Sequence, residues 1–424
     1  MKVLGLMSGT SLDGIDAALL EVEKADVEKA EGGVAPELPG VRWSLLAFRT
    51  RPYSREEREA IRGTLEEGRA RELALLHTRM GSWLAGAARG LLEEEGVDPR
   101  EVAVVGSHGQ TVWHEPPREG VRGSSFQLGC PATLAEETGL PVVSDFRARD
   151  LAAGGHGAPL VPWADRLLFS SPHRSRALQN LGGMANVTWL PVAGSPEPLL
   201  AFDTGPGVAL LDEAARLATG GRERCDRDGE LARRGKASRE LLDRLLAHPF
   251  FRQEPPRSTG REVFGSGMVR ELVEDVRPEE HPGGWPNLLA TLTALTARSI
   301  GDAYRRWVMP RGVEEAFLLG GGARNPALAE AIRRELEPLP VRSGQELGMD
   351  PDAREAAAFA LLAWGHLEGI PANVPEATGS RGPRVLGSWT PGARWGLAPG
   401  RHREMPSEEG PSTRGESETG EVSP

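Results

Sequence analysis

The sequence predicts an α/β protein built from two domains of related architecture. The chain has 424 residues, which is long for one domain and comfortable for two. Apolar runs of strand length alternate with helical patterns along most of it. Each half also opens on two strands separated by a turn rich in small residues, at residues 8–14 and again at residues 182–186. The residues of the two turns hardly repeat. The shared order of elements nevertheless indicates an internal duplication.

The composition excludes several classes of protein. Hydrophobic residues make up 39% of the chain and no apolar run approaches the length of a membrane span, so we expect a soluble protein with no membrane partner. The N-terminus has no signal-peptide pattern, and Cys130 and Cys225 match neither a disulfide framework nor a zinc site. A cytoplasmic location is therefore expected. The net charge of −11 argues against a nucleic-acid partner. Lysine 236 is the only lysine that follows a glycine, and its context is not that of a P-loop.

The first half begins with strands expected at Lys2–Met7 and Asp16–Val22. The nine positions 8–16, which span the turn and the first residue of the second strand, carry three hydroxyls and two carboxylates, and the turn is longer than the roughly two to five residues of an ordinary hairpin loop. We therefore favour a phosphate-binding turn over a plain loop. The other elements expected before residue 145 are strands at Val41–Arg49, Val102–Ser107, Phe126–Leu128 and Val142–Ser144, and helices at Arg55–Glu66, Ala70–Glu95 and about Ala132–Thr138.

Two segments of the first half could border a site. The strand at Val102–Ser107 is followed by His108 and Gln110. Both side chains could form a hydrogen bond with a sugar or contact a phosphate. For His108 alone, a satisfied histidine in a loop is slightly favoured. The charged segment 145–150 leads into a glycine cluster at 154–157. This pattern fits a hinge that faces a cleft, with a solvated loop as the alternative.

The second half contains the most informative stretch. An apolar run at 199–202 ends at Asp203, and Gly205-Pro206-Gly207 and a helical pattern at 209–217 follow. This order places Asp203 at the carboxyl end of a strand, beside a turn whose N–H groups could receive phosphate. Ligands of open α/β sheets gather at such ends. Taken alone, Asp203 could equally be the acidic N-cap of the helix.

Three consecutive glycines, at 320–322, separate an expected strand at 316–319 from an expected helix at Pro326–Leu336. A plain loop rarely needs three glycines, so nucleotide contact is favoured here. The segment 257–262 holds two arginines around hydroxyls, which could serve a substrate anion or a helix cap. The remaining elements expected in this half are strands at Arg176–Leu181 and Val187–Leu190, helices at Ala237–Ala247, Leu288–Val308 and Asp350–Leu367, and a disordered tail at 399–424.

Seven segments together resemble the anhydro-N-acetylmuramic acid kinase family, over residues 3 to about 390. The most specific is GLMSGTSLDGID at 5–16, because both its sequence and its position near the N-terminus match the family. The others are GSHGQTVWHEP at 106–116, DFRARDLAAGGHGAPLVP at 145–162, AFDTGPG at 201–207, RSTGRE at 257–262, LGGGARNPAL at 319–328 and the helix that holds Glu355.

The resemblance implies the two-domain sugar kinase/Hsp70/actin-like (ribonuclease H-like) fold with ATP in an interdomain cleft. The domains would be 1–148 and 149–398, with the last helix packing back toward the first domain. Family enzymes use ATP and Mg²⁺ to open 1,6-anhydro-N-acetylmuramic acid and phosphorylate O6, giving N-acetylmuramic acid 6-phosphate in the recycling of cell-wall peptidoglycan. Family members are commonly dimers, and the helix expected at Leu288–Val308 is one candidate surface.

The resemblance also implies roles for single residues, while the metal ligands stay unassigned. Asp203 matches the general base of the family. His108, Arg147 and Glu355 are candidates for sugar contacts. The nucleotide contacts would come from the first turn, the Gly-Pro-Gly turn and the glycine triplet: Gly9, Thr10, Ser11, Leu12, Asp13, Gly14, Ile15, Asp16, Gly205, Gly207, Gly320, Gly321, Gly322 and Asn325.

The chain departs from the family pattern at a few positions. His156 stands where Gln is common, and Val208 where Asn is common, so a polar side-chain contact at position 208 is not expected. Two other functions are compatible with the fold. One is a kinase for an ordinary sugar hydroxyl, with Asp203 deprotonating the substrate. The other is a non-catalytic nucleotide-dependent switch, which the absence of a substrate-peptide domain disfavours.

Overall fold

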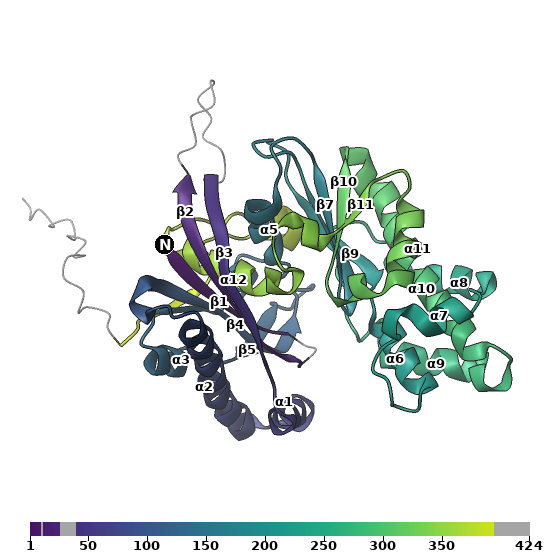
Figure 1. Ribbon diagram of the computed structural model, residues 1–424, viewed down its shortest axis with the longest axis horizontal. Helices are drawn as coiled ribbons and strands as arrows, with labels where there is room; N and C mark the ends of the chain where they lie inside the picture. Colours follow the sequence, from purple (N-terminus) through teal and green to yellow (C-terminus); the bar gives the residue numbers. More distant parts are fainter. Residues whose placement is uncertain (10–11, 26–39, 394–424) are drawn as a thin grey trace, which may run out of the picture.

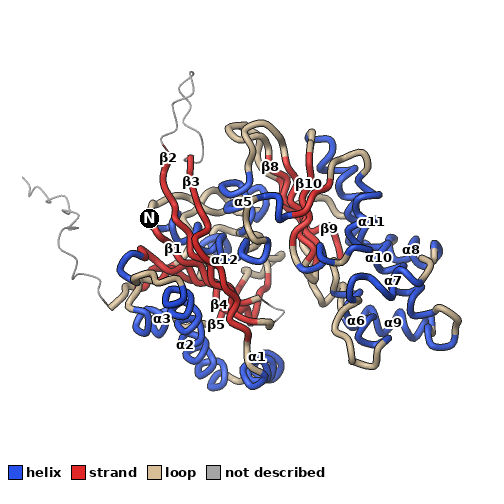
Figure 2. The backbone as a smooth tube through the Cα atoms, viewed as in Figure 1, coloured by secondary structure: helices blue, strands red, loops and turns tan. Residues whose placement is uncertain are grey.

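The computed structural model describes residues 1–9, 12–25 and 40–393. Thr10 and Ser11 of the predicted phosphate turn lie outside the described residues, as does the tail predicted at 399–424. The described chain forms two mixed β-sheets with helices around them (Figures 1 and 2). No helix within the described ranges is both long and apolar enough to cross a bilayer.

The two sheets repeat the same strand order and the same directions. In the first sheet the order is β3-β2-β1-β4-β6, and in the second it is β9-β8-β7-β10-β11. Each has three antiparallel strands in succession, followed by two that run parallel to the first strand of the repeat. The internal duplication predicted from the sequence is therefore confirmed. The first sheet gains two further strands, because β5 pairs with β4 and β12 pairs with β6.

The strands of the first sheet are β1 (Lys2–Ser8), β2 (Gly14–Ala25), β3 (Gly40–Pro52), β4 (Val102–Glu115), β5 (Ser124–Leu128), β6 (Val142–Ser144) and β12 (Ser388–Thr390). Those of the second sheet are β7 (Arg176–Leu181), β8 (Met184–Leu190), β9 (Leu200–Pro206), β10 (Glu315–Leu319) and β11 (Val341–Ser343).

Helices α2 (Ala70–Glu94) and α3 (Pro131–Thr138) cover one face of the first sheet, and α1 (Arg55–Glu67) packs on α2. Because side chains alternate along a strand, Leu4 and Leu6 of β1 face this layer while Val3 faces the opposite one. The start of α1 is fixed by a capping box between Ser54 and Glu57. These elements follow the boundaries expected from the sequence closely.

Helix α12 (Arg354–Leu367) lies directly on the other face of the first sheet. A Cβ on Gly5 would stand 1.8 Å from the carbonyl oxygen of Ala356, and one on Gly106 would stand 2.1 Å from that of Phe359. Only glycines in the strands allow this approach, and the alanines of α12 present a correspondingly flat surface. The close packing holds the first turn of α12, with Arg354 and Glu355, at the junction of the two sheets.

A layer formed by α12 and α5 (Val161–Phe169) joins the two sheets. Its apolar cluster includes Trp163 of α5 and Phe359 of α12, together with Leu178 and Phe317 of the second sheet. Both α12 and β12 follow the glycine triplet in sequence, yet they belong to the first sheet by packing. The division into domains at 148/149 stays a prediction.

On the opposite face of the second sheet, six helices of the described chain share one apolar cluster with its strands and gather at one end of the molecule (Figure 1). They are α6 (Ala209–Ala218), α7 (Glu230–Arg234), α8 (Arg239–Leu246), α9 (Ser266–Val276), α10 (Gly284–Ala303) and α11 (Pro326–Leu336). Helix α10 contacts α6, α7, α8, α11 and β9, and its apolar side chains are buried among them. The sequence-based choice of this helix as a dimer surface is therefore wrong, because its apolar face forms the centre of the core. Dimerisation itself stays a prediction.

Strands β4 and β9, which hold candidate site residues, run further than the sequence predicted. Strand β4 continues to Glu115, because β5 supplies pairing partners from Gln110 onward, so His108 lies inside a strand and not in a loop. Strand β9 continues to Pro206, and Asp203 pairs with Asn186 of β8 in its middle. The prediction that Asp203 ends its strand was wrong. The apolar run stops there because Asp203 lines a cavity at the junction of the two sheets.

Candidate active site

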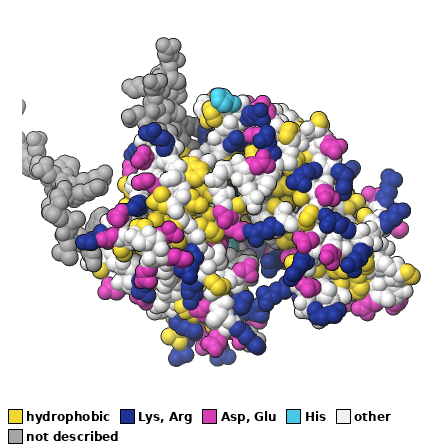
Figure 3. Space-filling view, in the orientation of Figure 1, with side chains coloured by type: hydrophobic (Ala, Val, Ile, Leu, Met, Phe, Trp, Pro, Cys, Tyr) yellow, Lys and Arg dark blue, Asp and Glu magenta, His cyan; other side chains and the backbone are white. Residues whose placement is uncertain are grey.

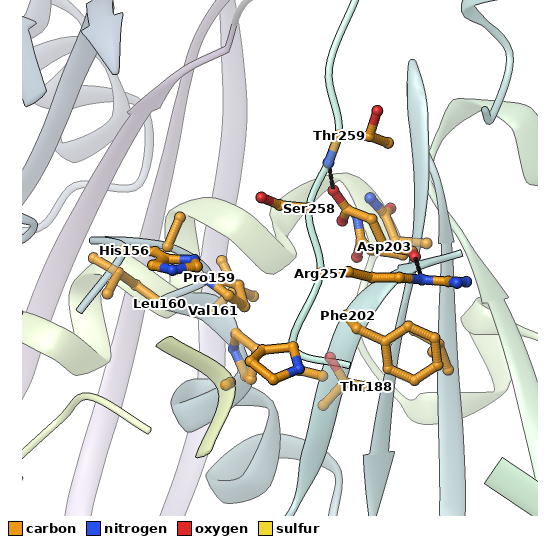
Figure 4. A pocket seen from close by; sticks show the side chains of 18 of the residues that line it. His156, Pro159, Leu160, Val161, Thr188, Phe202, Asp203, Arg257, Ser258 and Thr259 are labelled. Carbon is orange, nitrogen blue, oxygen red and sulfur yellow. Dashed lines mark hydrogen bonds between the residues drawn. The ribbon is translucent and has the colours of Figure 1, made fainter. Parts of the chain in front are cut away.

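A cavity of about 530 Å³ lies at the junction of the two sheets. Three groups of residues line it: the segment that leads into α5, with His156 and Leu160; strands β8 and β9, with Thr188 and Asp203; and the loop 256–262. In Figure 4 these groups surround one space, with His156 across from Asp203. Arg147 and Glu355 also line it, so Asp203 and these two residues, all singled out from the sequence, meet here.

The carboxylate of Asp203 is held in the wall of this cavity by a hydrogen bond from the loop 256–262. The backbone N–H of Thr259 donates to its Oδ2 at 2.8 Å (Figure 4). Burial raises the pKa of Asp203 to about 6, and Glu262 adds to this, while the Thr259 N–H and Arg257 oppose it. A carboxylate with a pKa near 6 can take a proton at neutral pH. Asp203 thus has the environment of a general base.

Arg257 links the backbone of Asp203 to the segment that precedes the loop 256–262. Its Nε donates to the carbonyl of Asp203 at 2.9 Å, and its Nη1 donates to the carbonyl of Gln253 at 2.8 Å. The guanidinium lies 4.5–5.4 Å from the ring centroids of Phe202, Phe250 and Trp307. These contacts occupy much of its guanidinium, while Arg257 also lines the cavity, so a contact of this segment with a substrate anion stays a prediction. Arg257 fixes the loop whose next residues contact the carboxylate.

The opposite wall is built around Arg147. Its Nη1 donates to the carbonyl of Gly157 at 2.8 Å, and its Nη2 donates to Nε2 of His108 at 2.9 Å. Burial lowers the pKa of Arg147 to about 10, and Glu355 opposes this. The pKa of Glu355 is itself raised by burial, which Arg354 and Arg147 counteract. His108 is buried behind Arg147 and does not line the cavity, contrary to its expected contact with the sugar.

Two buried carboxylates hold this wall in place. The carboxylate of Asp165 on α5 accepts hydrogen bonds from Nε and Nη2 of Arg354 at 2.8 and 2.5 Å. These bonds fix the start of α12 beside Glu355. Asp150 accepts from the N–H of Gly157 and from the side chains of Asn373 and Thr378. The charged segment 145–150 is therefore not a solvated loop, and its role as a hinge stays a prediction. Residues 148–152 form helix α4 (Ala148–Ala152), and its one fully buried carboxylate organises the glycine cluster.

The first predicted phosphate turn joins β1 to β2. Ser8 at its start is tied to the hydroxyl of Tyr53 at 2.7 Å and to Oε1 of Gln110 at 2.6 Å. Gln110 is fully buried in this network and so takes no part in the cavity. The side chains of Leu12 and Ile15 are also buried, and Gly14 packs against the carbonyl of Arg51. Of the described side chains at 9–16, only those of Asp13 and Asp16 are polar and not buried.

The Gly-Pro-Gly turn after Asp203 binds another part of the chain. The N–H groups of Gly207 and Ala209 donate to the carbonyl of Gly183, and that of Val208 donates to the carbonyl of Gly182. These amides are therefore not free for phosphate, and the prediction of free N–H groups there was wrong. The sequence could not show this, because the partner hairpin lies more than twenty residues earlier in the chain.

The glycine triplet packs on the same hairpin. A Cβ on Gly320 would lie 2.6 Å from Oδ1 of Asn180, and one on Gly322 would lie 2.6 Å from Cγ1 of Val208. Gly321 alone faces open space. Asn325 caps α11 by accepting the N–H of Leu328 at 3.2 Å. Internal packing thus explains Gly320, Gly322 and Asn325, and Gly321 is the position at which a ligand could approach.

Comparison with known proteins assigns this arrangement to a family. The sequence profile described as anhydro-N-acetylmuramic acid kinase matches residues 1–392. A protein named anhydro-N-acetylmuramic acid kinase from Gloeobacter violaceus is 44% identical over 383 residues, which cover 89% of this chain and 95% of that protein. One of the same name from Caldanaerobacter subterraneus is 40% identical over 91% of this chain and 96% of that protein. The chain belongs to the anhydro-N-acetylmuramic acid kinase family.

Membership of this kinase family, together with the duplicated pair of mixed sheets, confirms the fold class predicted from the sequence. Among solved structures, the activator of 2-hydroxyisocaproyl-CoA dehydratase from Clostridium difficile, with bound ADPNP, covers 87% of this chain and 96% of its own at 14% identity and a TM-score of 0.42. A likeness this low says nothing about activity.

Within the anhydro-N-acetylmuramic acid kinase framework, sequence reasoning missed three features of the site. Thr259 was quoted as part of RSTGRE but not assigned the contact with Asp203 that it makes. Asp150 and Asp165 were not assigned their buried roles. The available signal was weak, because each of these residues acts on a partner that is distant in sequence.

Proposed function

We propose that the chain is an ATP-dependent kinase that opens the 1,6-anhydro ring of 1,6-anhydro-N-acetylmuramic acid with water and phosphorylates O6. The product is N-acetylmuramic acid 6-phosphate, and the reaction serves the recycling of cell-wall peptidoglycan in the cytoplasm. Family membership supports the substrate. The observation that carries the mechanism is the carboxylate of Asp203, which has a pKa of about 6 and lies in the wall of a sugar-sized cavity.

Asp203 takes a proton from a water molecule, whose oxygen attacks the anomeric carbon. The bond from this carbon to O6 breaks, and O6 attacks the γ-phosphorus of ATP, so that ADP leaves. An inverting glycosidase needs a carboxylic acid as well, to protonate the leaving oxygen. Here the phosphoryl group captures that oxygen, and one carboxylate suffices. The free Oδ1 of Asp203 suits this role, since the one protein hydrogen bond to the carboxylate within the described residues is to Oδ2.

Arg147 and Glu355 are the groups we assign to the sugar. Both line the cavity with Asp203 and come from different elements, so they can hold the sugar from the side opposite the base. The Nε of Arg147 is buried and has no hydrogen-bond partner within the described chain. The two hydrogen-bond partners of its guanidinium in the described chain are neutral, so the positive charge of Arg147 favours an acceptor oxygen of the sugar.

ATP would be received by the turn 9–16 and by Gly321. Asp16 fits Mg²⁺, because burial and the charges of Glu355, Asp352 and Asp13 raise its pKa to about 6. A cation beside Asp16 would relieve this repulsion, and Mg²⁺ there would neutralise charge on the phosphates. No three acidic, histidine or cysteine side chains of the described residues cluster as a metal site. This agrees with the usual binding of Mg²⁺ by one or two carboxylates plus substrate phosphates.

The test is release of ADP from Mg-ATP by the purified protein, with and without the anhydro-sugar. We expect ADP only when the sugar is present, together with a 6-phosphorylated reducing sugar. No release of ADP would overturn the function. In water enriched in ¹⁸O, label at the anomeric carbon, corrected for exchange of the free anomer, supports hydrolytic opening. Its absence alongside ADP release would indicate a kinase for an ordinary sugar hydroxyl.

A further inference from the structure

His108 occupies a closed position between β4, α12 and Arg147. Its side chain is 5% exposed, and its ring centroid lies 4.6 Å from that of Phe359. Because side chains alternate along a strand, His108 points to the same face as Gly106, the face on which α12 packs. The ring therefore cannot turn away from its two polar neighbours without disturbing the contact between the helix and the sheet.

The two polar neighbours admit one protonation state. Nδ1 lies 2.8 Å from the carbonyl oxygen of Gly109, which can only accept, so Nδ1 carries the proton. Nε2 lies 2.9 Å from Nη2 of Arg147, which can only donate, so Nε2 carries the lone pair. The ring is thus a neutral Nδ1–H imidazole. Burial lowers its pKa to about 3, and the charge of Arg147 and the nearby His114 act in the same direction.

This imidazole fixes one side of the Arg147 guanidinium. The other anchor is the carbonyl of Gly157, whose own N–H is held by Asp150. Two acceptors on separate elements therefore set the plane of the guanidinium, and neither of them bears a charge. Nε stays buried without a partner within the described residues, and Arg147 lines the cavity that holds Asp203. Neutral anchors leave the positive charge of Arg147 available to a ligand.

We propose that His108 is a positioning residue, which as a neutral Nδ1–H imidazole accepts from Arg147 and so orients its guanidinium toward the sugar. The proposal rests on the proposed function, in which Arg147 binds the sugar. It assigns to His108 a role through Arg147 in place of the direct sugar contact expected from the sequence. His108 has no place in the proton transfer, since Asp203 lies across the cavity from this wall.

Loss of the acceptor should weaken the binding of the sugar and leave the chemical step unchanged. Without Nε2, one N–H of Arg147 is left buried and unpaired, and the guanidinium can turn toward Glu355. A hydrogen bond to a charged group is worth about tenfold or more in affinity. A uniform loss of binding raises KM without lowering kcat. The effect should be confined to the sugar, because Arg147 lies outside the turns assigned to ATP.

The kinetic test compares His108→Gln with His108→Leu. Glutamine places an amide oxygen at about the reach of Nε2 and restores an acceptor for Arg147, whereas leucine removes it. We expect the leucine variant to raise KM for the anhydro-sugar at least about tenfold, with kcat and KM for ATP within about threefold of wild type. The glutamine variant should recover most of the sugar KM. His281→Leu, at an exposed histidine, serves as the matched control and should change neither constant.

Equal sugar KM in the glutamine and leucine variants would overturn the proposal, as would a fall in kcat at unchanged KM. A second measurement needs no variant. In ¹⁵N-labelled wild-type protein, the ring nitrogens of His108 should show the Nδ1–H neutral form throughout pH 5–8. A protonated ring or an Nε2–H form would overturn the proposal even if the leucine variant failed to fold. Absence of sugar-dependent ADP release in the wild type would instead refute the proposed function and leave this protonation state in place.

Discussion

Asp203 and Thr259 are joined by a single hydrogen bond, in which the backbone N–H of Thr259 donates to Oδ2 at 2.8 Å. This bond connects the middle of β9 to a loop that begins more than fifty residues later. Arg257 secures the same loop through the carbonyl of Asp203. One oxygen of the carboxylate is thereby fixed by the protein, and the other is available to a water molecule in the cavity. Over the face of the molecule that Figure 3 shows, acidic and basic side chains are interspersed.

Replacement of the carboxylate should abolish turnover and spare the nucleotide site. Asp203→Asn keeps an acceptor for the Thr259 N–H but cannot take a proton from water, so we expect kcat to fall by about 10²–10⁴-fold. Binding of an ATP analogue, measured by calorimetry, should change less than about twofold. Asp243→Asn, at an exposed carboxylate of α8, is the control and should behave as wild type. Turnover near wild type in Asp203→Asn would assign the base elsewhere.

The pKa of Asp203 predicts an acid limb in the rate. Because the base must be ionised and its pKa is about 6, kcat/KM for the sugar should be constant above pH 7 and fall about tenfold per pH unit below 6. Asp16 also has a pKa of about 6, so the profile is measured at saturating Mg-ATP, where bound metal would keep Asp16 ionised. An acid limb centred near pH 4 would show that the base is an ordinary exposed carboxyl.

The same pKa predicts a cost in stability that the asparagine variant removes. The pKa of Asp203 is raised from 3.8 in the unfolded chain to about 6 in the folded one, so the folded state holds its proton more tightly. The stability gained from this is present below pH 4 and lost as the pH rises through 6. Asp203→Asn should therefore exceed the wild type by about 1–3 kcal/mol in free energy of unfolding at pH 8. The difference should shrink toward pH 4 in urea titrations. A difference independent of pH would contradict the assigned pKa.

The glycine triplet offers a matched pair of substitutions. A Cβ on Gly321 meets nothing within 4 Å, so Gly321→Ala should leave the melting temperature unchanged and raise KM for ATP if the nucleotide lies there. A Cβ on Gly322 would lie 2.6 Å from Val208 and 2.9 Å from Leu181, so Gly322→Ala should lower the stability by about 1–3 kcal/mol. Gly63→Ala on α1, also in open space, is the control. An unchanged KM for ATP in Gly321→Ala would remove this segment from the nucleotide site.

The sequence by itself determined the elements, the duplication and the family. Strands such as Lys2–Met7, the helix that begins at Arg55 and the turn between β1 and β2 all follow from patterns among near neighbours in the chain. The motifs around Asp203 and in GLMSGTSLDGID are also local, and they indicate the family to which the chain belongs. Local patterns are legible in a sequence because propensity, periodicity and capping act over only a few residues.

Tertiary structure alone decided which polar groups are already paired. The amides of Gly207 and Val208 are taken by the 182–183 hairpin, Arg257 is enclosed by three aromatic rings, and His108 lies behind Arg147 and not in the cavity. Each of these outcomes depends on a partner far away in sequence. The extra length of β4 and β9 has the same origin, since pairing with β5 and β8 supplied hydrogen bonds that the apolar pattern did not show. Whether a donor or acceptor is free for a ligand is set by long-range packing, and that is why the residue types of the site were predictable and their roles were not.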